Sequence, residues 1–113
     1  MDNEILVKEF RKIVRILRRE QGDVALFMLK NDDTEVADYW NVIVSTPAYD
    51  SLTTRKALKD LVRILRGNLS REVLRRIIRL TVLKTDDPFV TGINRAFEVA
   101  DSEKYIHSYV VSG

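Results

Sequence analysis

The chain has 113 residues, of which 45% are hydrophobic and 32% are charged, and its formal net charge is +2. This composition is typical of one globular domain with a hydrophobic core, and it argues against a disordered chain. Disulfides, thiolate metal sites and cysteine nucleophiles are excluded because the chain has no cysteine.

The first predicted element is an amphipathic helix over residues 3–20. Apolar side chains recur at helical spacing from Ile5 to Leu17, and basic side chains occupy the opposite face. Gly22 follows the last basic turn, which is a typical helix stop signal.

Two apolar segments of strand length follow, over residues 23–30 and 39–46, and we interpret them as a hairpin that organises the fold. Neither segment has a helical period, and the second is dense in aromatic and β-branched residues. The acidic segment 31–38 between them has the composition of a turn. Pro47 ends the second strand because proline has no amide hydrogen for a central ladder.

A second amphipathic helix is predicted from a cap at Ser51 or Thr53 to Arg66, with Gly67-Asn68 as its stop signal. Its expected inner face consists of Ala57, Leu58, Leu61, Val62, Ile64 and Leu65. Ser70 is expected to start a short third helix. In that helix Ile77 and Ile78 belong to the apolar side, and Arg79 belongs to the polar side.

The predicted elements after this point are a strand over residues 80–85, a helix over 88–99 and a strand over 105–111. Asp86-Asp87-Pro88 is a strong helix opening, with an acidic cap and proline at the first helical position. The order is therefore α-β-β-α-α-β-α-β within one α+β domain, residues 1–113. We expect a sheet of about four strands packed by about four helices.

The first half of this order resembles the core of the nucleotidyltransferase superfamily, which has the DNA polymerase β-like fold. In that family the first strand runs into a Gly-Ser pair, and an Asp-x-Asp or Asp-x-Glu pair opens the second strand. Leu26-Phe27 matches the first strand, and the resemblance covers residues 3–85. It implies a nucleotide-transferring fold that uses two magnesium ions.

The positions that carry this chemistry in the family are occupied by other residues. Met28-Leu29 stands in place of Gly-Ser, and Tyr39-Trp40-Asn41 stands in place of Asp-x-Asp. In the family the carboxylate pair supplies oxygen ligands to two magnesium ions, whereas Tyr39 is neutral and Asn41 offers only a neutral carbonyl oxygen. Asp38 is one residue out of register, so it belongs to the other face of the strand. The resemblance therefore implies no catalytic residues in this chain.

Basic helix faces provide a nucleic-acid-binding alternative, because a row of arginines can neutralise phosphates. The candidate residues are Arg11, Arg15, Arg18, Arg63 and Arg76. A charged outer face is also what an amphipathic helix needs for solubility alone.

A second alternative is a divergent nucleotide-handling enzyme that binds magnesium through Asp38, Asp86 or Asp87. Against it, acids in turns are commonly solvated, and Asp86 can act as a helix cap. His107 is the only histidine, and its alternation with apolar neighbours indicates a sheet position rather than a catalytic base.

The preferred hypothesis is a non-catalytic binding or regulatory module that acts through protein contacts and needs no cofactor. The near-continuous apolar strands indicate that both sheet faces are covered, either by the helices or by a second copy in a homodimer. Trp40 fits either a core or a recognition role. No apolar run approaches the roughly 20 residues that span a bilayer, and residues 1–4 lack signal-peptide features. We therefore expect a cytoplasmic protein with no membrane contact.

Overall fold

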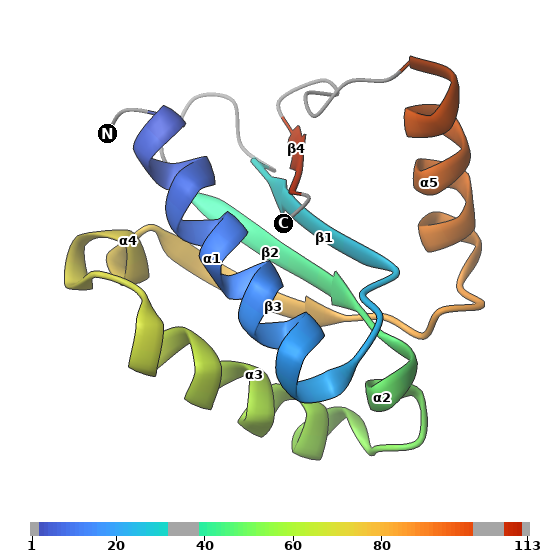
Figure 1. The fold of residues 1–113 in the computed structure, drawn as a ribbon, viewed down its shortest axis with the longest axis horizontal. Coiled ribbons are helices and arrows are strands. Elements are labelled where there is room, and N and C mark those ends of the chain that lie inside the picture. The colour runs from blue at the N-terminus through green and yellow to red at the C-terminus, as the bar shows by residue number, and fades with distance from the viewer. Residues whose placement is uncertain (1–2, 32–38, 101–107, 112–113) are drawn as a thin grey trace.

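The computed structural model describes residues 3–31, 39–100 and 108–111 of the chain, drawn as a ribbon in Figure 1. The elements in chain order are α1 (Asn3–Gln21), β1 (Leu26–Lys30), β2 (Trp40–Ser45), α2 (Pro47–Asp50), α3 (Thr54–Asn68), α4 (Arg71–Arg75), β3 (Ile77–Val82), α5 (Pro88–Ala100) and β4 (Ser108–Val110). The protein is a single α+β domain.

The strands form one mixed sheet in the order β3-β2-β1-β4. The predicted hairpin is confirmed, because β1 and β2 are antiparallel and pair from Leu26 with Ser45 to Lys30 with Asn41. The short strand β4 adds to β1 in antiparallel orientation, and β3 runs parallel to β2 at the opposite edge. A parallel pair needs a long crossover connection, which here contains α2, α3 and α4.

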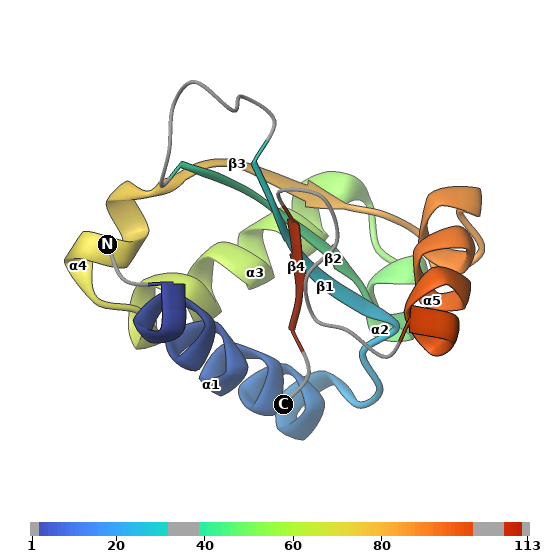
Figure 2. The ribbon, with the colours of Figure 1, turned by 90° about the horizontal axis from the view of Figure 1, so that it is seen from above.

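Helices contact both faces of the sheet. Figure 2 shows α1 and α3 on the same side of the strands, where Phe27, Leu29 and Val42 join the main hydrophobic core. The alternate side chains Leu26, Met28 and Ile43 face the other way and pack with α5 residues. Because successive side chains of a strand point to opposite faces, two buried faces explain why most residues of β1 and β2 are apolar. Trp40 is 5% exposed and belongs to the main core.

Local sequence signals set several element ends as predicted. The Thr53 hydroxyl accepts a hydrogen bond from Lys56 N and caps α3, and Ser70 caps α4 in the same way. Pro88 is the first residue of α5, and Asp87 accepts a hydrogen bond from Phe89 N. Gly22 ends α1 with a φ of 91°, a backbone conformation that glycine adopts without a Cβ clash.

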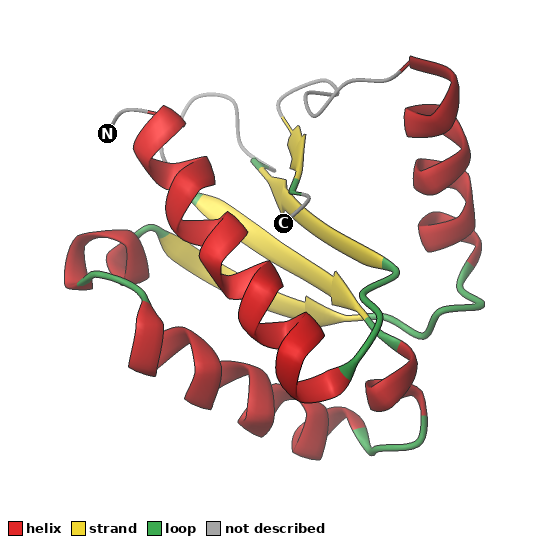
Figure 3. Cartoon of the chain, in the orientation of Figure 1, coloured by secondary structure: helices red, strands yellow, loops and turns green. Residues whose placement is uncertain are grey.

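The predicted boundary between the third helix and the third strand is wrong. Ile77, Ile78 and Arg79 belong to β3 rather than to a helix, and Figure 3 shows the strand beginning just after the short α4. Two consecutive β-branched isoleucines favour an extended backbone, and pairing with β2 fixes it.

Further differences from the prediction concern β1, α2, α3 and the end of β3, which is Val82 rather than Thr85. β1 begins at Leu26 rather than at Asp23, and α2 was not predicted. The helix α3 continues through Gly67-Asn68 to a cap at Leu69. Gly67 keeps a helical backbone within α3. Among the described glycines, only Gly22 has a positive φ.

Candidate interaction surface

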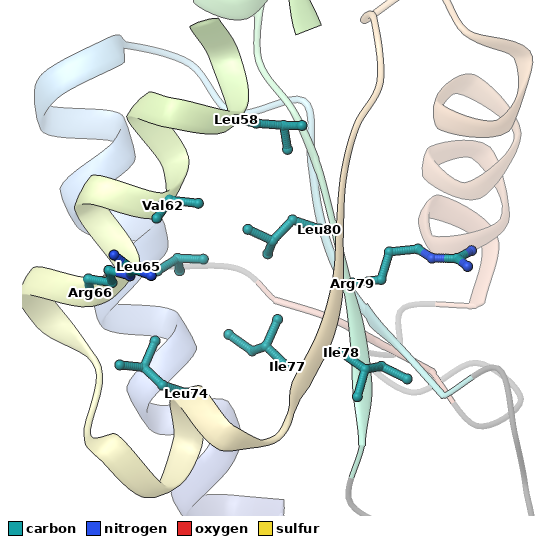
Figure 4. A pocket seen from close by; sticks show the side chains of 9 residues that line it. All are labelled: Leu58, Val62, Leu65, Arg66, Leu74, Ile77, Ile78, Arg79 and Leu80. Atoms are coloured by element: carbon teal, nitrogen blue, oxygen red, sulfur yellow. The ribbon is translucent and has the colours of Figure 1, made fainter. Parts of the chain in front are cut away.

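An apolar groove lies between α3 and the edge strand β3, and Figure 4 shows it from close by. Its volume is about 380 Å³. The lining residues are Leu58, Val62, Leu65 and Arg66 of α3, Leu74 of α4, and Ile77, Ile78, Arg79 and Leu80 of β3. Ile77 and Leu80 point towards α3, whereas Arg79 extends to the opposite side of the strand (Figure 4).

The groove exists because the apolar side of α3 is wider than the surface that the core covers. At 100° per residue, the apolar residues from Ala57 to Leu65 span an arc of about 160°, more than the roughly 100° that a surface helix buries. Ala57, Leu61, Ile64 and Leu65 are buried in the core. Leu58 and Val62, at one margin of the arc, remain half-buried and line the groove. This excess width is the sequence signal that some apolar surface of α3 remains outside the core.

The strand β3 contributes an open edge to this surface. It is the terminal strand of the sheet on this side, so among the described residues no strand pairs with its outer edge. The pairing shifts between Trp40 and Asn41, which leaves Ile78 as an extra residue of β3, a β-bulge. A bulge re-aims a side chain, and Ile78 is accordingly 62% exposed. An exposed isoleucine therefore stands beside an apolar groove at an unpaired sheet edge.

The part of the chain that builds this surface is strongly basic. Residues 54–82 carry nine basic side chains and two acidic ones, although the whole chain has a net charge of only +2. A second hollow continues along α3 from the groove, lined by Thr54, Arg55, Leu58, Lys59 and Val62. No acidic side chain of the described residues lines the groove or this hollow. The apolar surface is therefore bordered by positive charge.

One of the two acids, Asp60, is held on the side of α3 that faces α1. Its carboxylate accepts hydrogen bonds from Tyr49 Oη at 2.7 Å, Gln21 Nε2 at 2.9 Å and Arg63 Nη2 at 2.8 Å. Burial opposes its ionisation, but the bonds from Arg63 and Tyr49 outweigh burial and hold the pKa of Asp60 below its usual value. Burial and the bond to Asp60 raise the pKa of the Tyr49 hydroxyl well above its usual range. This cluster fastens α3 to α1 and α2.

A second contact fixes the end of α3 that leads into α4. The carboxylate of Glu9, on α1, accepts hydrogen bonds from Ser70 N at 2.9 Å and from Ser70 Oγ at 3.1 Å. Ser70 is also the N-cap of α4. The α1 helix therefore contacts the segment that forms one wall of the groove at two places, near the middle of α3 and just after its end.

The arginines predicted to bind nucleic acid do not form one row. Arg63 Nη2 lies 3.1 Å from Glu20 and 2.8 Å from Asp60, and these two carboxylates raise the pKa of its guanidinium. Arg63 contacts Glu20 near the end of α1, whereas α4, which Arg76 follows, is joined to α1 through Ser70 and Glu9. Glu9 and Glu20 are about 16 Å apart along α1 at 1.5 Å per residue. Arg63 and Arg76 therefore belong to opposite ends of the helical layer. Arg11, Arg15 and Arg18 are on α1, where Arg15 and Arg18 are exposed and Arg11 is half-buried.

Arg76 belongs to a polar hollow near the starts of β2 and β3. This hollow is lined by Tyr39, Arg71, Glu72, Arg75 and Arg76. The Arg76 guanidinium lies 5.6 Å from the centre of the Tyr39 ring, a cation–π contact. The structure thus gathers three arginines around one aromatic ring, an arrangement that the sequence alone did not indicate.

The residues predicted to bind magnesium are not shown together. Asp38 lies outside the described residues, as do Asp32, Asp33, Glu35 and His107. Asp86 and Asp87 lie in the turn before α5, where Asp87 caps the helix through Phe89 N at 2.8 Å. Within residues 3–31, 39–100 and 108–111, no three acidic or histidine side chains cluster in a way that could hold a metal ion.

The positions singled out by the nucleotidyltransferase resemblance lie inside the sheet. Met28 and Leu29 are 2% and 0% exposed in β1. Asn41 is buried in β2, and its Oδ1 accepts a hydrogen bond from Thr81 Oγ1 at 3.0 Å. Neither strand offers an exposed carboxylate at these positions.

Comparison with known proteins found no matching family model, no matching curated protein and no matching solved structure. Among the helices that the structure describes, none has the length and apolar character needed to cross a bilayer.

Proposed function

We propose that the protein is a non-catalytic binding module that contacts a protein partner through the groove between α3 and β3. The observation that carries this proposal is an apolar groove at an unpaired sheet edge, with Ile78 62% exposed beside it. Exposed apolar surface of this kind, rimmed by charged residues, is typical of protein interaction sites.

A fold of the nucleotidyltransferase type without the family's chemistry is part of the same proposal. The order of α1, β1 and β2 supports it, as does the buried, uncharged character of Met28 and Asn41. A carboxylate pair on β2 would be needed to hold magnesium ions, and the chain has none there.

A nucleic-acid-binding function is the second candidate, and a specific observation favours it. The basic side chains of residues 54–82 outnumber the acidic ones nine to two, and Tyr39 with Arg71, Arg75 and Arg76 combines an aromatic ring with cations. Stacking on aromatic rings and phosphate neutralisation are the two components of single-strand binding. Unlike the groove, this hollow is lined by charged side chains and one aromatic ring among the described residues.

The proposed function can be tested with a photo-crosslinking amino acid placed at Leu58, on the groove, or at Lys8, an exposed position on α1. We expect a defined protein adduct in the source cells from Leu58 and none of the same mass from Lys8. The captured protein, once purified, should bind the wild-type chain and lose affinity for Val62→Glu. Equal adducts from both positions, or undiminished binding to Val62→Glu, would contradict the proposal.

A further inference from the structure

We infer that the partner enters as an extended, acidic segment of another protein that adds a strand to the outer edge of β3. This inference rests on the proposed function and specifies how the groove is occupied. An added strand satisfies backbone groups through main-chain hydrogen bonds, and side-chain pockets beside the edge provide the selectivity.

The backbone of β3 presents groups for such pairing. Leu83 N donates to Val44 O at 3.0 Å, so the N–H of Leu83 is directed towards β2. Because alternate residues of a parallel strand turn their N–H and C=O groups to opposite sides, those of Thr81 also face β2. The N–H and C=O groups of Leu80 and Val82 then face the outer edge, where no described strand lies.

The groove lies where the side chains of an added strand would point. On the α3 side of the sheet, Leu80 faces Leu58 and Val62, so every second side chain of an added strand would enter apolar surroundings (Figure 4). A helix placed in the groove could cover these side chains but would leave the backbone groups of Leu80 and Val82 unpaired. An extended segment fits both features.

The charges around the groove select an acidic segment. Arg66 lines the groove, Arg55 and Lys59 line its continuation along α3, and Arg79 extends from β3 on the side away from α3 (Figure 4). Opposite charges across an interface favour encounter and exclude partners of the same sign. A second copy of this chain would bring its own Arg66 and Arg79 towards the same cations, and like charges opposite each other destabilise a strand pair. The basic border therefore favours a different, acidic partner over self-pairing.

The inference can be tested by amide hydrogen exchange on the full chain, labelled with nitrogen-15. The probe is a synthetic peptide that alternates glutamate and valine over the length of β3. We expect it to slow exchange of the Leu80 and Val82 amides by about tenfold at saturation, with little change at Thr81, whose amide already faces β2. N-methylation of the peptide residues that face β3 should abolish the protection, and N-methylation of the alternate residues should not.

Two controls separate failure of this inference from failure of the proposed function. Val62→Glu should remove peptide binding, and Ile5→Glu, at a 53% exposed position of α1 outside the groove, should not. Peptide binding that depends on Val62 but leaves Leu80 and Val82 unprotected would overturn strand addition while leaving the groove as the binding site. Peptide binding that Val62→Glu leaves unchanged, or no binding at all, would overturn both strand addition and the groove as the binding site.

Alternative occupants give distinct results in the same experiment. A lysine–valine peptide of the same length should not bind. Protection of Leu80 and Val82 that grows with protein concentration in the absence of peptide would identify a second copy as the occupant. Single-stranded DNA that protects these amides when the acidic peptide does not would replace the protein partner with nucleic acid. Either result would contradict the inference.

Discussion

Asp60 is the side chain through which α3 forms hydrogen bonds to both α1 and α2. Its carboxylate accepts hydrogen bonds from Tyr49 of α2, Gln21 at the end of α1 and Arg63 of α3 itself. Each of these bonds has a charged acceptor, and such bonds are stronger than bonds between neutral groups. Since α3 forms one wall of the groove, Asp60 contributes to the binding surface without being exposed on it.

Replacement of Asp60 by asparagine should destabilise the fold in a pH-dependent way. The pKa of Asp60 is lower in the folded chain than its usual 3.8, so its charge stabilises the fold above that pH, and this stabilisation is lost as the pH falls through the folded value. We expect Asp60→Asn to lower the free energy of unfolding by about 2 kcal/mol near neutral pH. The two proteins should converge below pH 3.8 in urea unfolding. Asp86→Asn, at an exposed position, is the control, and an equal loss there would contradict this role for Asp60.

Tyr49 should give the opposite pH dependence. Its pKa is raised above 10.0, so stabilisation by the neutral hydroxyl is complete below pH 10 and is lost as the pH rises towards the folded value. Tyr49→Phe should lose about 1 kcal/mol at neutral pH because the bond to Asp60 is removed. Its stability should then fall less steeply than that of the wild type above pH 10, as measured by urea midpoints. Tyr39→Phe, at an exposed tyrosine, is the control and should show the same dependence of stability on pH as the wild type. If Tyr49→Phe also shows the wild-type pH dependence above pH 10, the role given to the Tyr49 hydroxyl is wrong.

At the scale of elements, a contact between α1 and the N-cap residue of α4 also holds a wall of the groove in place. Ser70 caps α4 through Val73 N at 3.2 Å and also contacts Glu9 on α1. The short helix α4 carries Leu74, which lines the groove. Ser70 therefore both caps the first turn of α4 and joins α4 to α1.

Removal of the Ser70 hydroxyl should destabilise the protein by about 1 kcal/mol, the usual effect of losing an N-cap. A double-mutant cycle of Ser70→Ala with Glu9→Gln should show coupling, because the two side chains contact each other. Chemical unfolding measures both quantities. Ser51→Ala, at an exposed serine after α2, is the comparison variant and should be close to neutral. Additive single effects would mean that the Glu9 contact does not stabilise the fold.

At the same scale, local signals explain why much of the fold was predictable and the groove was not. Period, caps and proline positions located α1, α3, α5 and the β1–β2 hairpin, because each of these signals acts within a few residues. Ile77 to Arg79 satisfy a helical pattern as well as a strand pattern, and only the tertiary pairing with β2 decides between them. Likewise, the sequence gives the width of the apolar arc of α3 but not which margin the core leaves uncovered. The scattered positions of Arg63 and Arg76 also follow from tertiary contacts.

The distribution of charge over the whole molecule leads to a prediction about its oligomeric state. Residues 54–82 carry nine basic and two acidic side chains, whereas acidic residues outnumber basic ones in the rest of the chain, and residues 54–82 include the groove that a homodimer would bury. Self-association through this surface would bring like charges together, so we expect light scattering to give the monomer mass of 13.1 kDa at micromolar protein and low salt. A mass of twice this value that Val62→Glu reduces to the monomer would instead support a homodimer through the groove.

The whole molecule also predicts how the chain responds to nucleotides. A ligand that binds only the native state at a hundred times its dissociation constant adds about 2.7 kcal/mol, which raises the unfolding midpoint of a domain of this size by several degrees. Since Met28, Leu29 and Asn41 occupy the positions where the resemblance would require phosphate- and magnesium-binding groups, we expect no shift with any nucleoside triphosphate, with or without magnesium. Thermal unfolding across the four ribonucleotides measures this. A magnesium-dependent rise that is lost on alanine substitution of Asp38, Asp86 or Asp87 would restore the enzyme hypothesis. A rise without magnesium that is lost on Arg75→Ala would instead assign phosphate binding to the hollow beside Tyr39.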